Sequence, residues 1–516
     1  MKFISIFNDV LGPVMRGPSS SHTAGSYRIG VIARSLLDET PESVMFTFDP
    51  GGSYIKTYRQ QGVDLALAAG LMEWPITDER FPHALDTARK EGIKIEFNSA
   101  PLAEAHHPNT VQIDMRGSSG KKLSAVAQST GGGAVQYVQI DGWPVDLDGK
   151  SWYLLVECNK NAVPEVADIV STGERVIEEY SGQEAGNNVL VAVRSADPLD
   201  SRTYSRIKAL SEVKNIRSVL PVFFIMRGKA LFESAEEMIA AAEARHCSLG
   251  RVALEYESAL LGLTEEEALN EMIMRLDVMR KSVADGLRNE NVRMQLLEPT
   301  AGRLLKAESS GKVAIGGIHT RAAARAMAAM HVSNSMGTVC AAPTAGSAGV
   351  IPGVIVSLVE DNKINPENAA VALFAASAVG LIVAQRATFA AEVAGCQVEI
   401  GAAGAMAAAA VVEYAGGTAR QAADAAAISF QNSMGSICDL VQGMCEIPCH
   451  TRNAAAASGA FVCADIVLGG YYNPIPLDET IDSMYAVGKM LPAELRCTAL
   501  GGIAVTPSAL AMRQLR

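Results

Sequence analysis

The chain has 516 residues, of which 49% are hydrophobic and only 5% aromatic, and its formal net charge at pH 7 is −12. This length predicts more than one domain and a large core built mainly from Ala, Val, Leu and Ile. The acidic balance argues against nucleic acid or an anionic membrane as the main partner, because both repel negative charge. An anionic substrate would therefore need basic groups placed locally around it.

Residues 1–150 mix helical and strand patterns. Residues 20–37 predict a helix entered from a Gly-Pro-Ser loop, and residues 80–91 predict a second helix. Strands are expected at 43–48 and 94–97, where apolar residues alternate or cluster. We therefore expect an N-terminal α/β domain.

Residues 151–226 predict a small separate α/β module. Its expected elements follow the order β-α-β-α-β, which suits helices packed on one sheet. They are a strand at 153–157, a helix at 163–179, a strand at 188–193, a helix at 203–211 and a strand at 219–224.

From residue 234 to residue 516 the pattern is helical almost throughout, which predicts a mostly all-α C-terminal domain. Alanine-rich runs, such as residues 402–410, indicate helices that pack closely in a buried bundle. The apolar run 369–384 is short for a membrane span and predicts a core helix instead. The fold class is thus multidomain α+β, with no membrane partner expected.

The chain has nine cysteines, too few for a disulfide scaffold at this length, and its opening residues lack a signal peptide pattern. Both features favour reduced thiols in the cytoplasm. Cys396, Cys438 and Cys449 lie on or beside loops rich in Gly, Pro and Ser, and are candidate ligands of one iron–sulfur cluster. These three residues form no Cys-x-x-Cys motif. The simpler interpretation is that they are buried, unreactive side chains.

Three stretches together resemble the iron–sulfur-dependent bacterial L-serine dehydratases. The first is Gly17-Pro-Ser-Ser-Ser-His-Thr-Ala-Gly25, and the second runs from Met336 through Pro343-Thr-Ala-Gly-Ser-Ala-Gly349. The third comprises Gly395-Cys-Gln, Glu399-Ile-Gly401 and Pro448-Cys-His-Thr-Arg-Asn-Ala454. The resemblance covers nearly the whole chain and implies the order β domain, ACT-like module and α domain, fused in one polypeptide.

The resemblance implies a 4Fe–4S cluster held by Cys396, Cys438 and Cys449. With three thiolate ligands, one iron would stay open as a Lewis acid for the substrate hydroxyl. A base would then remove the α-proton, and β-elimination of water would yield a 2-oxoacid and ammonia. The same chemistry needs no pyridoxal phosphate. On this interpretation Cys340 and Cys445 are spare thiols, and Cys158, Cys247, Cys463 and Cys497 have no assigned role.

The resemblance also suggests residues for catalysis and substrate binding. The N-terminal loop would close over the cluster and offer hydroxyl and N–H groups to a carboxylate. His22 is either an acid–base group or a hydrogen-bonded loop residue. Arg452 with Asn453 is either a carboxylate clamp or a helix-end arginine and its neighbour. The catalytic candidates are Ser19, Ser20, Ser21, His22, Gln61 and Asp64, and the substrate-binding candidates are Asn334, Thr344, Arg386, Arg452 and Asn453.

Several positions depart from the family pattern. Gln61 and Val63 stand where the family has a histidine and a threonine, and an amide does not titrate. Arg386 and Phe389 replace small polar groups before the first ligand cysteine, which favours a larger or more acidic substrate.

Three functions therefore stay open. The first is an L-serine ammonia-lyase, or one acting on a close β-hydroxy amino acid. The second is the same cluster fold acting on another small hydroxy or β-thiol acid, and the third is an inactive cluster-bearing sensor. A homodimer is the expected assembly, with the ACT-like module as a candidate dimerisation element.

Overall fold

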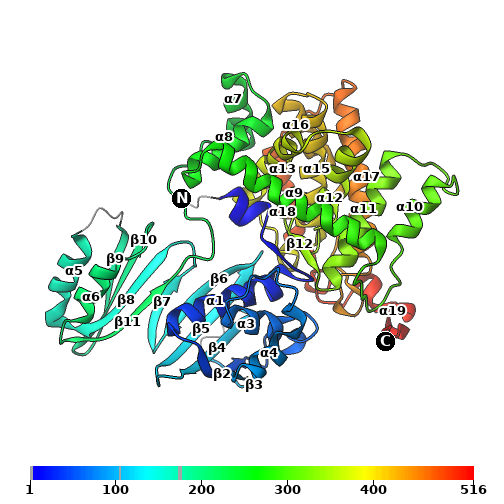
Figure 1. Cartoon of the computed structure of the whole chain (residues 1–516). Helices are drawn as coiled ribbons and strands as arrows, with labels where there is room; N and C mark the ends of the chain where they lie inside the picture. Colours follow the sequence, from blue (N-terminus) through cyan, green and yellow to red (C-terminus); the bar gives the residue numbers. More distant parts are fainter. Residues whose placement is uncertain (1–3, 104–105, 173–176, 516) are drawn as a thin grey trace. The chain divides into compact units, whose positions relative to one another are not determined.

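The computed structural model describes residues 4–103, 106–172 and 177–515. The chain forms two compact units (Figure 1). The sheet unit comprises Ser21–Arg227, and the helical unit comprises Met1–Ser20 together with Gly228–Arg516. The first segment of the chain thus belongs with the C-terminal helices. The N-terminal part contains the sheets and the C-terminal part is helical, which confirms the prediction of an α+β fold.

The larger part of the sheet unit is a six-stranded sheet of order β3-β2-β4-β5-β6-β7, in which only β2 and β3 run parallel. Helix α1 packs across β4, β5 and β6, and α3 packs on α1. Glycines permit this close helix packing, because a Cβ on Gly30 would lie 2.6 Å from the Leu67 carbonyl oxygen. The strands and helices are β2 (Pro41–Phe48), β3 (Lys94–Ser99), β4 (Thr110–Gly117), β5 (Lys122–Gly131), β6 (Ala134–Ile140), β7 (Trp143–Leu147), α1 (Gly25–Leu37), α2 (Tyr54–Thr57), α3 (Val63–Leu71) and α4 (Ala84–Lys90).

The smaller part of the sheet unit is an antiparallel sheet of order β11-β8-β10-β9 within the connectivity βαββαβ, a ferredoxin-like arrangement. The prediction missed β9, because this edge strand is polar and has no apolar alternation. The predicted helix at 163–179 ends at Ser171, and the last strand precedes the expected position. The elements are β8 (Trp152–Asn159), α5 (Val163–Ser171), β9 (Ile177–Ala185), β10 (Asn188–Ser195), α6 (Ser201–Lys208) and β11 (Val213–Val219).

The helical unit is built around α13 and α15, whose side chains are mostly buried. Two stretches, Pro366–Arg386 and Cys396–Tyr414, are long and apolar enough by composition to cross a membrane, yet they lie mostly buried in this unit. This confirms the expectation of a buried helix at 369–384. The helices are α7 (Ala235–Arg245), α8 (Leu249–Leu261), α9 (Glu265–Arg288), α10 (Ala301–Ser309), α11 (Ile318–Asn334), α12 (Val350–Asn362), α13 (Pro366–Arg386), α14 (Ala391–Ala394), α15 (Ile400–Tyr414), α16 (Ala419–Ser433), α17 (Cys449–Leu468), α18 (Leu477–Met490) and α19 (Pro507–Ala511).

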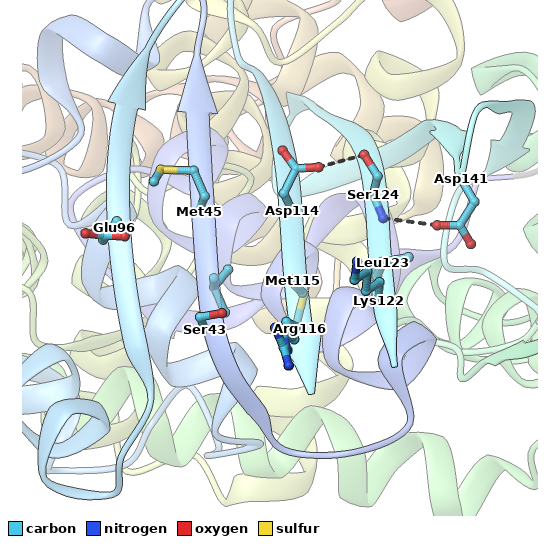
Figure 2. A pocket seen from close by; sticks show the side chains of 11 residues that line it. Ser43, Met45, Glu96, Asp114, Met115, Arg116, Lys122, Leu123, Ser124 and Asp141 are labelled. Carbon is cyan, nitrogen blue, oxygen red and sulfur yellow. Dashed lines mark hydrogen bonds between the residues drawn. The ribbon is translucent and has the colours of Figure 1, made fainter. Parts of the chain in front are cut away.

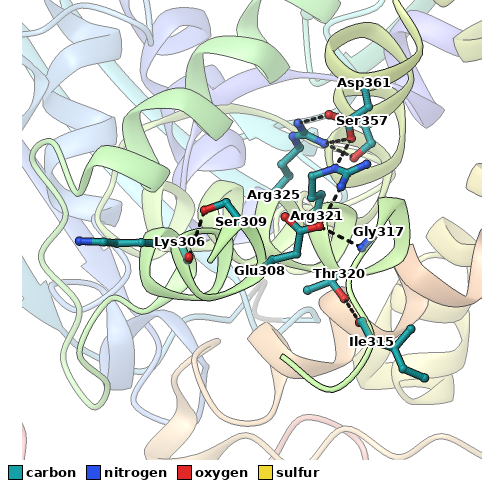
Figure 3. Close-up of polar contacts among 10 residues, drawn as sticks. All are labelled: Lys306, Glu308, Ser309, Ile315, Gly317, Thr320, Arg321, Arg325, Ser357 and Asp361. Atoms are coloured by element: carbon teal, nitrogen blue, oxygen red, sulfur yellow. Dashed lines mark hydrogen bonds and ion pairs between the residues drawn. The ribbon is translucent and has the colours of Figure 1, made fainter. Parts of the chain in front are cut away.

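A network of charged side chains joins α10, α11 and α12 (Figure 3). Arg325 on α11 donates to Ser357 and to Asp361 on α12, at 2.7 Å each. Arg321 binds both Asp361 and Glu308, each at 2.8 Å. This network holds the N-terminal half of α11 against the C-terminal end of α12 and connects both to α10.

The N-terminal segment is anchored in the helical unit. Strand β1 (Val14–Arg16) pairs antiparallel with β12 (Thr338–Cys340). The buried carboxylate of Glu257 on α8 accepts hydrogen bonds from the Ser5 hydroxyl and from two backbone N–H groups, at 2.6–3.0 Å. These contacts hold residues 4–17 against α8 and β12.

We expect the stability of this anchor to fall with rising pH. Burial raises the pKa of Glu257 to about 7, although its hydrogen bonds from Phe7, Ser5 and Ile6 work in the opposite direction. A carboxyl whose folded pKa lies above its unfolded value contributes stability below the unfolded pKa and loses it as pH rises through the folded one. The free energy of unfolding should therefore decline between about pH 5 and about pH 8, by up to roughly 3 kcal/mol.

Urea denaturation of the protein and of Glu257→Gln across that range measures this effect. The variant has no carboxyl at this position, so its pH dependence should be shallower. Parallel profiles for the two proteins would contradict the assignment.

Candidate active site

The three predicted ligands lie in different local structures of the helical unit. Cys396 begins the 3₁₀ turn Cys396–Val398, directly after Gly395. Gly395 has φ +77, and a Cβ there would lie 2.6 Å from the Ser436 carbonyl oxygen. Only glycine fits this close approach, which brings the Cys396 turn against the segment leading to Cys438. Cys449 is the first residue of α17.

Five thiols from four stretches of the chain gather here, and we call them the thiol cluster. The Cys396 and Cys438 thiols are in hydrogen-bonding contact, as are those of Cys438 and Cys497 and those of Cys449 and Cys445. The sequence had assigned no cluster role to Cys445 or Cys497. The members are Cys396, Cys438, Cys445, Cys449 and Cys497.

The surroundings favour the protonated form of the Cys396 and Cys449 thiols. The contact with Cys438 and burial raise the pKa of Cys396 well above its usual value. The contact with Cys445 and burial do the same for the pKa of Cys449. A soft metal that binds such thiols displaces their protons. Several thiols gathered in one place are the kind of donor set that a thiolate-ligated iron–sulfur group requires.

No group of three or more His, Cys, Asp and Glu side chains within residues 4–103, 106–172 and 177–515 is arranged to hold one metal ion. Each ligand of a 4Fe–4S cluster binds a different iron. Ligands of that kind need not converge on a common point.

Arg452 on α17 connects the ligand segments to one another. Its guanidinium donates to the Cys396 sulfur at 3.7 Å and to the Ile437 carbonyl at 2.8 Å. It also forms an ion pair with Asp439 at 2.9 Å. The Arg452 guanidinium, which the sequence suggested as part of a carboxylate clamp, therefore already contacts three groups of the protein.

Asn453 holds the loop 343–349 against the start of α17. Its buried amide donates to the carbonyls of Gly346 and Cys449, both at 2.9 Å, and accepts from the Gly349 N–H at 3.1 Å. The side chain is fully buried. These hydrogen bonds fix the position of the loop 343–349 relative to the first turn of α17.

Thr344, in the same loop, donates a short hydrogen bond to Glu399. Burial raises the pKa of Glu399 to about 7, opposed by that hydrogen bond. A Cβ on Gly346 would lie 2.7 Å from the Glu399 carboxylate, so a side chain there would require this carboxylate to move. The sequence analysis did not select Glu399, although it lies within the Glu399-Ile-Gly401 motif.

Asn334, the last residue of α11, lies beside the thiol cluster. Its amide donates to the Cys445 carbonyl at 2.7 Å and contacts His450 Nε2 at 2.6 Å. Burial lowers the pKa of His450 to about 3, so the ring is neutral and accepts this bond. The preceding residue, Ser333, packs so closely on Gly17 that a Cβ there would lie 2.0 Å from the Ser333 carbonyl oxygen. The start of the predicted serine loop is therefore fixed near Asn334.

That serine loop is divided between the units, with Ser19 and Ser20 in the helical unit and Ser21 in the sheet unit. In the sheet unit, Ser21 Oγ contacts His22 Nδ1 at 3.1 Å, and His22 Nε2 contacts Ser53 Oγ at 3.1 Å. Burial lowers the pKa of His22 to about 4, so the ring is neutral near pH 7. Ser53 is a further member of this group that the sequence analysis did not single out.

Gln61 and Asp64 flank the start of α3 in the sheet unit. The Gln61 carbonyl accepts from the Thr23 hydroxyl at 2.9 Å, which ties it to the serine loop. Asp64 is buried in the first turn of α3, and burial raises its pKa to about 6. Gln61, Ser21 and His22 therefore belong to one neighbourhood.

Arg386 has a different environment. It is the last residue of α13 and forms ion pairs with Asp482 and Asp478 on α18. Asp478 also accepts from the Ala235 N–H at 3.0 Å. The ion pairs described for Arg386 join helices, and none of them reaches the thiol cluster.

A separate pocket of about 390 Å³ lies on the outer face of the six-stranded sheet. Figure 2 shows Glu96, Met45, Asp114 and Ser124 side by side on neighbouring strands. One of the carboxylates that line this pocket already has a partner, because Asp114 accepts a hydrogen bond from the Ser124 hydroxyl at 2.7 Å. None of the residues that line it is a cysteine, a histidine or a predicted site residue, so we do not assign it to the active site.

Two separate parts of the chain are similar to known proteins. The family model for the serine dehydratase alpha chain matches residues 208–504. The probable L-serine dehydratase alpha chain of Bacillus subtilis is 40% identical over 280 residues, which cover 54% of this chain and 93% of that protein. The probable beta chain of the same organism is 32% identical over 223 residues, covering 42% of this chain and 99% of that protein.

The L-serine dehydratase alpha chain of Peptoniphilus asaccharolyticus is 35% identical over 275 residues, which cover 53% of this chain and 94% of that protein. Counterparts of two separate chains therefore occur here in one polypeptide. The chain belongs to the bacterial L-serine dehydratase family and contains both its beta and its alpha parts.

Proposed function

We propose that the protein is a 4Fe–4S-dependent ammonia-lyase that converts L-serine, or a close β-hydroxy amino acid, to a 2-oxoacid and ammonia. The observation that supports this most is the meeting of Cys396, Cys438 and Cys449 from separate segments in one buried place. Its relatives carry the name L-serine dehydratase. When bound, the cluster would supply a Lewis acid for the departing hydroxyl group.

The chain's own residues would hold and orient this site. Cys396, Cys438 and Cys449 are the proposed ligands, and Arg452 fixes the segments that carry two of them. Asn453 and Thr344 shape the loop 343–349. A catalytic role for His22, which lies in the sheet unit, stays a prediction.

The other assignments stay predictions: catalytic roles for Ser19, Ser20, Ser21, Gln61 and Asp64, and substrate contacts for Asn334 and Arg386. So do an ACT-like role for the small module, a homodimer, a cytoplasmic location and independence from pyridoxal phosphate.

A second substrate class remains a candidate because Gln61, which cannot titrate, lies in the His22 neighbourhood. On that basis the enzyme would keep the cluster and act on another hydroxy acid or on a β-thiol amino acid. An inactive sensor would keep the cluster and turn over none of these compounds.

Anaerobic purification followed by iron and sulfide assays tests the cofactor directly. Release of oxoacid from L-serine, L-threonine, L-cysteine and simple 2-hydroxy acids then tests the substrate. We expect cluster loading and oxoacid from serine, both lost on exposure to air. A loaded protein that turns over only another compound supports the second class. Protein without iron, or turnover insensitive to oxygen, would contradict the proposal.

A further inference from the structure

Cys497 is held beside Cys438 by the backbone. The Cys438 N–H donates to the Leu495 carbonyl at 2.8 Å, and the Cys497 N–H donates to the Cys438 carbonyl at 2.9 Å. Together they form an isolated parallel bridge between Cys438 and Arg496. The separation of the two cysteine backbones is therefore set by hydrogen bonds and is independent of any bound group.

The conformation of Cys497 is unusual for a residue with a side chain. Its φ is +63, in the left-handed region. In a regular parallel pair, the residue after the directly paired one points to the opposite face. Here the two thiols are instead in side-chain contact, and both are free cysteines.

The segment after Cys497 is also fastened to the Cys438 loop. The Ile503 N–H donates to the Asp439 carboxylate at 2.9 Å. A Cβ on Gly502 would lie 2.4 Å from the same carboxylate, so the two segments pack without a gap. Contacts on both sides of Cys497 thus keep its thiol next to Cys438.

We propose that Cys438 and Cys497 form a disulfide in the cluster-free protein on oxidation by a peroxide, and that this bond prevents cluster assembly. Cys497 is the partly exposed residue of the pair and Cys438 is buried, so we assign the first oxidation to Cys497. The Cys497 thiol becomes a sulfenic acid with release of one water. The Cys438 thiol then attacks that sulfur, forms the S–S bond and releases a second water, so peroxide is the oxidant consumed.

The consequence for assembly rests on the proposed function, since it takes Cys438 as a cluster ligand. Oxidation would withdraw one of three ligands from use while leaving the other two free. A dithiol reductant would restore it. The pair would thus keep the cluster-free protein in a form that recovers on reduction.

Peptide mapping tests the pairing. The full-length protein is stripped of iron under argon, reduced, freed of reductant, treated with hydrogen peroxide and alkylated before digestion. We expect a peptide linked through Cys438 and Cys497, which dithiothreitol removes. A bond between Cys396 and Cys438, a bond between Cys445 and Cys449, or no bond at all would overturn the proposal.

Cluster transfer from a loaded scaffold protein, without added thiol, tests the consequence. Peroxide-treated protein should fail to load, whereas Cys497→Ser treated in the same way should load as fully as the reduced protein. Cys463→Ser removes another buried thiol. After peroxide treatment this variant should fail to load, as the unaltered protein does.

Two outcomes separate the proposals. If reduced Cys497→Ser folds by circular dichroism but cannot load, Cys497 is itself a ligand and the inference fails. If the linked peptide forms but the reduced protein never loads, the pairing stands and the proposed function fails.

Discussion

Replacing Cys449 with alanine is expected to abolish stable iron loading and the proposed activity. The same holds for Cys396→Ala and Cys438→Ala, because each removes one of only three proposed thiolate ligands. Loss of an outer partner of a metal ligand commonly costs roughly 10- to 100-fold in affinity or activity, and loss of a ligand should cost more. Iron and sulfide per chain, measured under argon, are the primary readout.

Cys463→Ala is the matched control for these variants. Cys463 is a buried cysteine on α17, the helix that begins with Cys449, and it is not a member of the thiol cluster. This variant should keep full iron and full turnover. If Cys449→Ala also kept both, its assignment as a ligand would be wrong.

Arg452→Gln is expected to lower cluster retention sharply while leaving the apparent substrate affinity of the loaded fraction nearly unchanged. The guanidinium bridges Cys396, Ile437 and Asp439, so its loss frees two ligand segments from each other. It also removes a hydrogen bond to a ligand sulfur, and such bonds tune cluster reduction potentials. We therefore expect a lower iron content, faster loss of iron in air and a shifted midpoint potential.

Arg452→Lys separates this positioning role from a carboxylate clamp. Lysine keeps the charge but lacks the planar fork that reaches several partners at once. The positioning role predicts that lysine restores little of the iron content. The clamp predicts normal iron in both variants and a rise in KM. Normal iron retention together with a raised KM would therefore show that the carboxylate interpretation is the correct one.

Much of this protein could be predicted from local sequence patterns. Alanine-rich runs with helical spacing predicted the buried helices around α13 and α15, because periodicity reports directly on a helix and its buried face. The cysteine, glycine and serine motifs predicted the family, which the comparisons confirm. The polar edge strand β9 gave no such signal, since only its position at the sheet edge makes it a strand.

The tertiary structure alone decided which of these residues meet. Cys445 and Cys497 carry no motif that distinguishes them from Cys158 or Cys463, yet folding brings them to the thiol cluster. The partners of Arg452 could not be read from its neighbours in sequence. Arg386 was also predicted to bind substrate, yet it pairs with Asp482 on α18. Local sequence sets the backbone preferences of each segment, whereas contacts between distant segments depend on how all the helices pack together.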